Sequence, residues 1–175
     1  KSKKGFLTFP TKFDMVEPLL PLRHRGRIIL RMSVNPNEII RRIEFGTSAL
    51  ASRINALNRM SDAGYTVGIL IAPVVLVDNW KELYKELIEQ LSDQISEKTK
   101  KQLFIEIIFM TYSYVQRAIN KEAFPNAVEL FDNALMTGRG RGKYCYREDV
   151  RAVGEQFLRE QLSQKLNHVP IIYVV

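Results

Sequence analysis

The sequence contains very little cysteine and histidine. Cys145 is the only cysteine among 175 residues, and His24 and His168 are the only histidines. One thiol forms no internal disulfide, which agrees with a reducing compartment. Zinc and iron–sulfur sites usually need three or four cysteine or histidine ligands. We therefore do not expect the chain to hold a transition metal by itself.

Long apolar runs are also absent. No stretch approaches the roughly 20 residues needed to cross a bilayer, and residues 1–5 lack the apolar segment of a signal peptide. Hydrophobic residues make up 46% of the chain and charged residues 26%, which suits a folded domain with a substantial core. The composition predicts one cytoplasmic domain with no membrane partner.

Acidic residues are fewer than basic ones. The net charge of +7 and the pI of about 9.6 favour an anionic partner such as nucleic acid or an acidic membrane surface. A basic surface also serves solubility alone, so charge by itself leaves both explanations open. His24 is expected to be a surface or capping residue whose arginine neighbours add phosphate contacts. The basic residues crowd two stretches, Arg23, His24, Arg25, Arg27 and Arg31, then Arg139, Arg141, Lys143 and Arg147.

Four short apolar runs predict β-strands at residues 6–9, 27–34, 65–71 and 103–109. They are rich in β-branched and aromatic residues. Their near-continuous hydrophobicity predicts burial on both faces, as in a parallel sheet. The first strand would present an open apolar edge, which folded proteins usually pair or cover. Because the sequence begins abruptly at a strand, missing N-terminal residues are favoured over a cover supplied by this chain.

Amphipathic segments between these strands predict helices, so the order is the βαβ signature of an α/β fold. Thr47 or Ser48 is expected to cap the first helix, and Gly64 to end it. Asp78 or Asn79 is expected to cap the second. The predicted apolar positions are Leu50, Ile54 and Leu57 in the first, then Trp80, Leu83, Tyr84, Leu87, Ile88, Leu91 and Ile95 in the second.

The pattern changes after the fourth strand. Short helices are predicted over 114–123 and 127–134, followed by a glycine- and arginine-rich loop or hairpin over 137–146. A last helix over 149–166 precedes a strand or docking segment over 169–175. We find no internal repeat and no linker between domains.

Candidate binding residues follow three of the predicted strands. They are Lys12, Ser33 together with Asn35, and Ala72 before Pro73. Ligands of parallel α/β proteins bind beyond the carboxyl ends of strands. A lysine there suits a carboxylate or phosphate, a serine suits a ribose or an amino-acid head group, and a small alanine lets backbone approach. A single strand-end serine is more often structural, and the coincidence of three positions favours a ligand site.

The hairpin suggests contact with DNA. Arg139, Arg141 and Lys143 supply charges for phosphates, while Tyr144 and Tyr146 offer ring faces for exposed bases. Strand alternation would put both tyrosines on one face. An enzyme that acts on a base must take that base out of the stack, and a wedged hairpin is one way. The alternative is a solvated basic turn.

Several long segments resemble the spore photoproduct lyases. They are TKF at 11–13, VEPLLPLRHRGRIILRMSVNPNEIIRRIEFGTS at 16–48, AGYTVGILIAP at 63–73, TYSYVQRAINKEAFPNAVELFD at 111–132 and MTGRGRGKY at 136–144. The resemblance implies the C-terminal part of a radical S-adenosylmethionine (SAM) enzyme. It implies later strands of a partial (β/α)6 barrel over 1–135, and a basic hairpin and C-terminal helix over 136–175 of the same domain.

The resemblance also implies an activity. SAM and a [4Fe–4S] cluster would yield a 5′-deoxyadenosyl radical that reverts the spore photoproduct thymine dimer in DNA to two thymines. Family positions at the SAM pocket match Lys12, Ser33 and Ala72, and positions against lesion DNA match Arg139, Arg141, Lys143 and Tyr144.

The family's CxxxCxxC motif has no counterpart in this chain, and Cys145 does not match the family's hydrogen-donating cysteine. The chain alone is therefore predicted to be inactive, with the cluster ligands supplied by a missing N-terminal half. Two alternatives stay open: a non-catalytic remnant that binds damaged DNA, or half of a split enzyme. A radical SAM enzyme with another substrate is a third, which the match in the hairpin disfavours.

Overall fold

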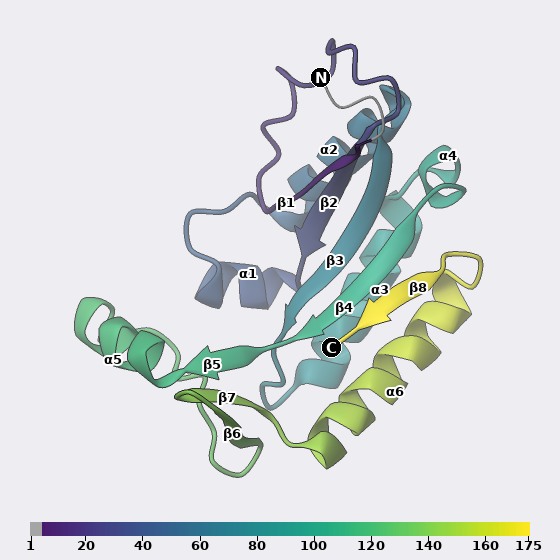
Figure 1. Cartoon of the computed structure of the whole chain (residues 1–175). Helices are drawn as coiled ribbons and strands as arrows, with labels where there is room; N and C mark the ends of the chain where they lie inside the picture. Colours follow the sequence, from purple (N-terminus) through teal and green to yellow (C-terminus); the bar gives the residue numbers. More distant parts are fainter. Residues whose placement is uncertain (1–4) are drawn as a thin grey trace.

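A five-stranded parallel sheet forms the centre of the computed structural model, which describes residues 5–175 (Figure 1). Residues 1–4, part of the segment used in the signal-peptide argument, lie outside the described residues. The strand order is β1-β2-β3-β4-β8, and every neighbouring pair is parallel. All four predicted strands and the terminal strand are confirmed. Their bounds are β1 Leu7–Thr11, β2 Ile28–Val34, β3 Thr66–Val74, β4 Phe104–Phe109 and β8 Ile171–Val174.

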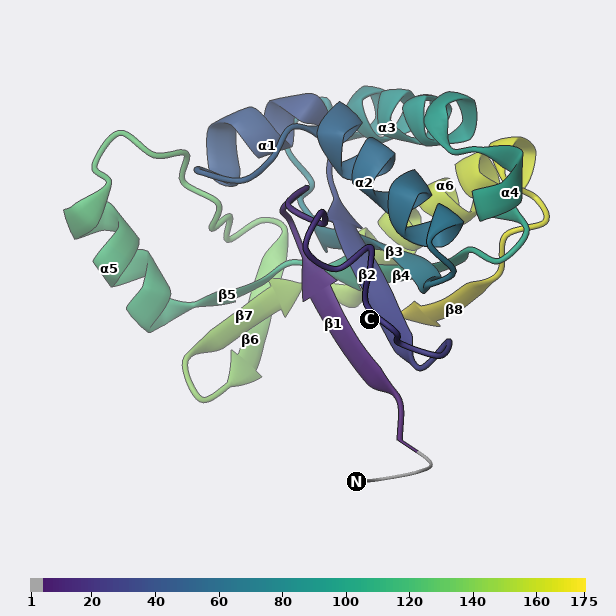
Figure 2. The ribbon, with the colours of Figure 1, turned by 90° about the horizontal axis from the view of Figure 1, so that it is seen from above.

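Five helices cover one face of this sheet (Figure 2). They are α1 Asn37–Ile43, α2 Leu50–Asp62, α3 Trp80–Gln94, α4 Glu97–Lys100 and α6 Glu148–Lys165. The predicted apolar stripes of α2 and α3 lie in the core between helices and sheet, except that Trp80 is only half-buried. The last segment, 136–175, contributes both α6 and β8 to this main body.

The opposite face of the sheet is less buried. Along β4, Ile105, Ile107 and Phe109 lie in the core, whereas the alternating residues of 104–108 are half-buried. The prediction of burial on both faces is therefore wrong for β1 and β4 among the described residues, because the helices of this part of the chain pack on one face only. An ion pair between Arg31 Nη1 and Glu106 Oε2, 3.2 Å apart, belongs to the other face. Strand β1 forms an open edge, as expected.

A small antiparallel sheet extends from the end of β4. Its order is β5-β7-β6, with β5 Thr111–Ser113, β6 Met136–Gly140 and β7 Lys143–Tyr146. Only Met110 separates β4 from β5, so one stretch of chain feeds both sheets. Helix α5, Tyr114–Ala123, follows β5 and confirms the first predicted short helix.

The prediction of a second short helix over 127–134 is wrong. That segment contains a bend and a turn but no helix or strand. The side chain of Glu129 accepts a hydrogen bond from the backbone of Phe131, and that of Asp132 from the backbone of Ala134. Such local side-chain bonds compete with helical backbone bonds.

The cap of α2 also differs from the prediction. The helix begins at Leu50 after Ala49, without a side-chain cap. The Thr47 hydroxyl instead donates to the Glu44 carbonyl and that of Ser48 to the Asp14 carboxylate, each over 2.7 Å. Asn79 precedes α3 as expected but makes no capping bond. Gly64 ends α2 with a positive φ of 84°, as predicted. No helix among residues 5–175 has the length and apolar character of a bilayer span.

Candidate functional site

The three predicted strand-end residues converge on one point. The Ser33 hydroxyl donates to the Ala72 carbonyl over 2.8 Å, and the Lys12 ammonium lies 3.4 Å from the same oxygen. The parallel pairing of β1, β2 and β3 brings their carboxyl ends to one rim, which explains this convergence. The sequence therefore located three residues that meet in space, although they are up to 60 positions apart.

A cavity of about 550 Å³ opens beside these residues. Its polar groups come from Lys12, Ser33 and neighbouring threonines. The remaining wall is apolar. It therefore combines a cation and a hydroxyl at one end with an apolar surface for a ring system, a common design for small-molecule sites. The lining residues are Pro10, Thr11, Lys12, Phe13, Ser33, Thr47, Leu70, Ala72, Pro73 and Ile108.

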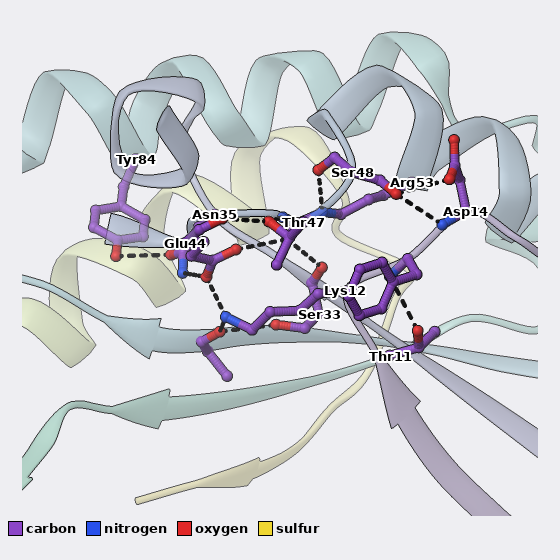
Figure 3. A network of polar contacts seen from close by, with 12 residues as sticks. Thr11, Lys12, Asp14, Ser33, Asn35, Glu44, Thr47, Ser48, Arg53 and Tyr84 are labelled. Atoms are coloured by element: carbon purple, nitrogen blue, oxygen red, sulfur yellow. Dashed lines mark hydrogen bonds and ion pairs between the residues drawn. The ribbon is translucent and has the colours of Figure 1, made fainter. Parts of the chain in front are cut away.

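A buried carboxylate, Glu44, anchors the lysine (Figure 3). Its Oε1 atom accepts hydrogen bonds from the Lys12 ammonium and, over 2.7 Å, from the Asn35 amide. The side chain of Glu44 is 4% exposed, against 30% for Lys12. The ammonium thus lies between a buried anion and the open cavity.

Arg53 completes this charge cluster. Its side chain is fully buried, and Nη1 lies 2.8 Å from Glu44 Oε2 in an ion pair. That carboxylate oxygen receives no aligned hydrogen bond within residues 5–175, so the contact is ionic. The guanidinium donates instead to the carbonyl oxygens of Ser33 and Ser48 and to the Thr47 hydroxyl, over 3.0, 2.8 and 2.6 Å. Lys12, Arg53 and Glu44 taken together carry a net charge of +1.

Sequence reasoning missed Glu44 and Arg53. A signal was present for Arg53, because it lies three residues after Leu50 and four before Leu57, on the predicted apolar face of α2. A charged residue on an apolar face usually has a buried partner. Glu44 carries no such signal, since it follows the end of a short helix.

The hairpin of β6 and β7 presents the predicted basic side chains. Arg139, Arg141 and Lys143 are exposed. The backbone φ values of Gly140, Arg141 and Gly142 are all positive, at 85°, 52° and 68°, so the chain reverses in the left-handed region. Glycine adopts this region easily, which accounts for the two glycines that flank Arg141.

The tyrosines of the hairpin behave differently from the prediction. Tyr144 is half-buried, with its ring edge-on to Phe131 at 4.7 Å between centroids. Tyr146 is only 5% exposed, and burial raises its pKa to about 12. The expectation that Tyr146 offers a ring face to a base is therefore wrong, because its ring packs in the core.

The other basic stretch precedes β2 at the opposite end of the sheet (Figure 1), except for Arg31, which lies within β2. There the His24 ring stacks on Tyr65 at 3.7 Å, and its Nε2 atom lies 3.1 Å from the Ala63 carbonyl. His24 is therefore half-buried and not a surface residue, and its Nδ1 atom accepts a hydrogen bond from the Gly26 N–H over 3.2 Å in the turn before β2.

Among the described residues, no group of three histidine, cysteine or acidic side chains is placed to hold a metal ion. Cys145 is free and half-buried in β7.

Comparison with known proteins assigns the family. The model of the spore photoproduct lyase family matches residues 1–175. The chain is 31% identical over 171 residues to a spore photoproduct lyase of Bacillus subtilis (strain 168), covering 95% of this chain and 49% of that protein. It is 30% identical over 164 residues to that of Geobacillus sp. (strain Y412MC61), covering 91% and 48%. The chain thus spans about half the length of these relatives.

Solved structures agree with this assignment. Spore photoproduct lyase complexed with dinucleoside spore photoproduct superposes with a TM-score of 0.93 at 27% identity, over 99% of this chain and 52% of that one. A double mutant with bound AdoMet and dinucleoside spore photoproduct gives 0.92 at the same identity and coverage. With both its sequence and its α/β architecture matched throughout, the chain belongs to the spore photoproduct lyase family.

Proposed function

We propose that this chain is the C-terminal part of a radical SAM carbon–carbon lyase that reverts the spore photoproduct in DNA to two thymines. The observation that carries the proposal is the convergence of Lys12, Ser33 and Ala72 on one apolar cavity. A structure similar to this chain holds AdoMet and the dinucleoside lesion, which supports both ligand classes. Repair of genomic DNA agrees with the cytoplasmic location expected from the composition.

The chemistry of the cavity suits SAM. The Lys12 ammonium would hold the carboxylate of its amino-acid part. The Ser33 hydroxyl donates its proton to the Ala72 carbonyl, so its oxygen would accept a hydrogen bond from the α-ammonium of the same amino-acid part. The apolar wall would accept the adenosyl part, close to the backbone of Ala72. When bound, SAM is the source of the 5′-deoxyadenosyl radical that the family resemblance implies. This chain's own contribution is to bind and orient SAM.

The residues do not suit a [4Fe–4S] cluster. One free cysteine and no candidate group of ligands within residues 5–175 cannot replace the three cysteines of the family motif. We propose that the cluster ligands lie outside this chain.

The five-stranded sheet, with helices of residues 5–175 on one face only, agrees with a barrel that further strands would complete. The less buried face of the sheet would become the barrel interior, and the edge strand β1 would pair with the preceding strand. Residues 1–135 would form the later barrel strands, and 136–175 the hairpin and last helix of the same domain. The relatives are about twice as long as this chain, which leaves length for those strands.

The hairpin would contact the lesion DNA. Exposed Arg139, Arg141 and Lys143 are available for phosphates, and the exposed part of Tyr144 for a base edge. The left-handed turn at Arg141 holds the tip of the hairpin narrow.

Binding of SAM tests the role of Lys12. In the complete native protein, Lys12→Gln should weaken SAM binding by about tenfold or more, because a hydrogen bond to a charged group contributes about 1.5–3 kcal/mol. Calorimetric titration measures the affinity. Lys98→Gln is the matched control, since Lys98 is 62% exposed and pairs with Asp62 on the helical side. Equal affinities for the two variants would refute the assignment.

The activity test separates the two readings of the chain. With reductant, SAM and an oligonucleotide that contains the spore photoproduct, the complete native protein should release 5′-deoxyadenosine and restore thymines. Lesion-specific DNA binding without either product would instead support the second candidate, a non-catalytic remnant. The single cysteine favours that candidate for the chain taken alone.

A further inference from the structure

Two adjacent backbone N–H groups after β3 are bound by tyrosine hydroxyls from different elements. Val75 donates to the hydroxyl of Tyr84 in α3 over 2.8 Å, and Leu76 donates to that of Tyr146 in β7 over 2.9 Å. All four groups are buried. Because buried N–H groups must be paired, these hydroxyls fix the course of the segment that leaves the rim.

On one side, this segment is connected to Lys12. The Tyr84 hydroxyl donates to Asn35 Oδ1 over 3.2 Å, and the Asn35 amide donates to Glu44 Oε1 over 2.7 Å. The same carboxylate oxygen holds the Lys12 ammonium (Figure 3). Four hydrogen bonds therefore lead from the Val75 backbone to the lysine of the cavity.

On the other side, the segment is connected to the hairpin. Tyr146 pairs with Met136 at the base of the hairpin, whose outer part carries Arg139 and Arg141. Its ring lies edge-on to Phe109, with centroids 6.4 Å apart. The hydroxyl thus belongs to the base of the hairpin that would receive DNA.

We infer that Tyr146 is a positioning residue that couples DNA binding at the hairpin to SAM binding at Lys12. A displaced hairpin moves the Tyr146 hydroxyl, and with it the Val75–Leu76 backbone on which Tyr84 and Asn35 are aligned. The inference rests on the proposed function, which supplies both ligands. Linkage requires the coupling to be reciprocal: each ligand changes the affinity for the other by the same factor.

The test compares SAM affinity with and without lesion DNA. The complete native protein is titrated with SAM in the calorimeter, alone and saturated with an oligonucleotide that contains the spore photoproduct. We expect the two dissociation constants to differ by about fivefold or more, a usual size for coupled sites. Tyr146→Phe keeps the ring and removes only the hydroxyl. In this variant, the ratio of the two SAM dissociation constants should fall to within about twofold of one, although SAM and lesion DNA both still bind. That result would show that the coupling is lost while the two sites remain intact.

Tyr65→Phe is the matched control. The Tyr65 ring is fully buried, and its hydroxyl donates to the Leu19 carbonyl at the opposite end of β3. It should lose stability yet keep the ratio of the native protein. Tyr84→Phe breaks the same path on the cavity side and should lower the ratio as well, which decides the matter if Tyr146→Phe does not fold.

Each outcome has one meaning. A native ratio retained by Tyr146→Phe, or by Tyr84→Phe when the first variant does not fold, overturns the inference. A native protein that binds both ligands with a ratio of one also overturns it and leaves the proposed function intact. A native protein that binds neither SAM nor lesion DNA contradicts the proposed function itself.

Discussion

At the scale of single residues, the burial of Arg53 organises the rim of the sheet. A fully buried guanidinium is costly unless it is paired and hydrogen-bonded. Arg53 is paired with the Glu44 carboxylate. Its guanidinium also donates hydrogen bonds to the Ser33 carbonyl near the end of β2 and to the Ser48 carbonyl in the loop before α2. Because Glu44 also holds Lys12, the arginine indirectly sets where the ammonium of the cavity lies.

Replacement of Arg53 tests this arrangement. Arg53→Met should lower the free energy of unfolding by about 3–5 kcal/mol, since it breaks a buried pair and leaves a buried carboxylate with weaker compensation. Urea denaturation monitored by circular dichroism measures the loss. Arg59→Met, six residues further along α2, removes an arginine whose side chain is 41% exposed and paired with Glu17, so it should cost less than about 1 kcal/mol. Similar losses in both variants would contradict the role given to Arg53.

At the scale of elements, close packing fixes α6 against the end of β4. A Cβ atom built on Gly154 would lie 2.8 Å from the Phe109 ring and 3.6 Å from the Leu76 side chain. Both neighbours are buried, so neither is free to move aside. The glycine thus permits a contact that any larger residue prevents.

Gly154→Ala tests the contact because two effects oppose each other. Helix propensity favours alanine by about 1 kcal/mol. Overpacking costs about 1–3 kcal/mol, and we expect it to win, so the melting temperature should fall. Phe109→Leu should relieve the clash, which makes the double variant more stable than the sum of the single effects predicts. A higher melting temperature for Gly154→Ala alone would show that the helix shifts freely.

The hairpin is a second element whose role is measurable. If Arg139 and Arg141 bind phosphates, replacing both with alanine should reduce the slope of log affinity against log salt concentration by about 2. Fluorescence anisotropy with a labelled oligonucleotide gives the slope. Lys81→Ala with Lys85→Ala removes the same charge from the exposed side of α3 and should leave the slope nearly unchanged. An equal reduction in both double variants would indicate a general charge effect.

At the scale of the whole molecule, the number of cysteine ligands limits which iron–sulfur cluster this chain can bind by itself. Anaerobic reconstitution with iron and sulfide should leave far fewer than four irons per chain, because a four-iron cluster needs about three or more cysteine ligands. Iron analysis and the visible absorption spectrum measure the content. Cys145→Ser should give the same residual value. A stable cluster with four irons per chain would contradict this prediction.

Much of the architecture was determined by local sequence pattern. Strand and helix periodicity depends on neighbouring residues, so the parallel strands, α2, α3 and the terminal strand were all predicted. The strand-end positions of Lys12, Ser33 and Ala72 followed from the same strands. The helix expected over 127–134 and the cap expected at Thr47 or Ser48 failed because their polar side chains bind other partners.

Tertiary structure alone decided the partners of these groups. Glu44 lies 32 positions from Lys12 in the sequence. Tyr146 lies 70 positions from Leu76, the residue whose N–H donates a hydrogen bond to its hydroxyl. Hydrophobic periodicity predicts that a side chain is buried but carries no information on which distant polar group completes its hydrogen bonds. The sequence by itself therefore determined the sheet, the rim and the basic hairpin. The folded chain decided that a buried ion cluster supports the rim, and that a buried tyrosine joins it to the hairpin.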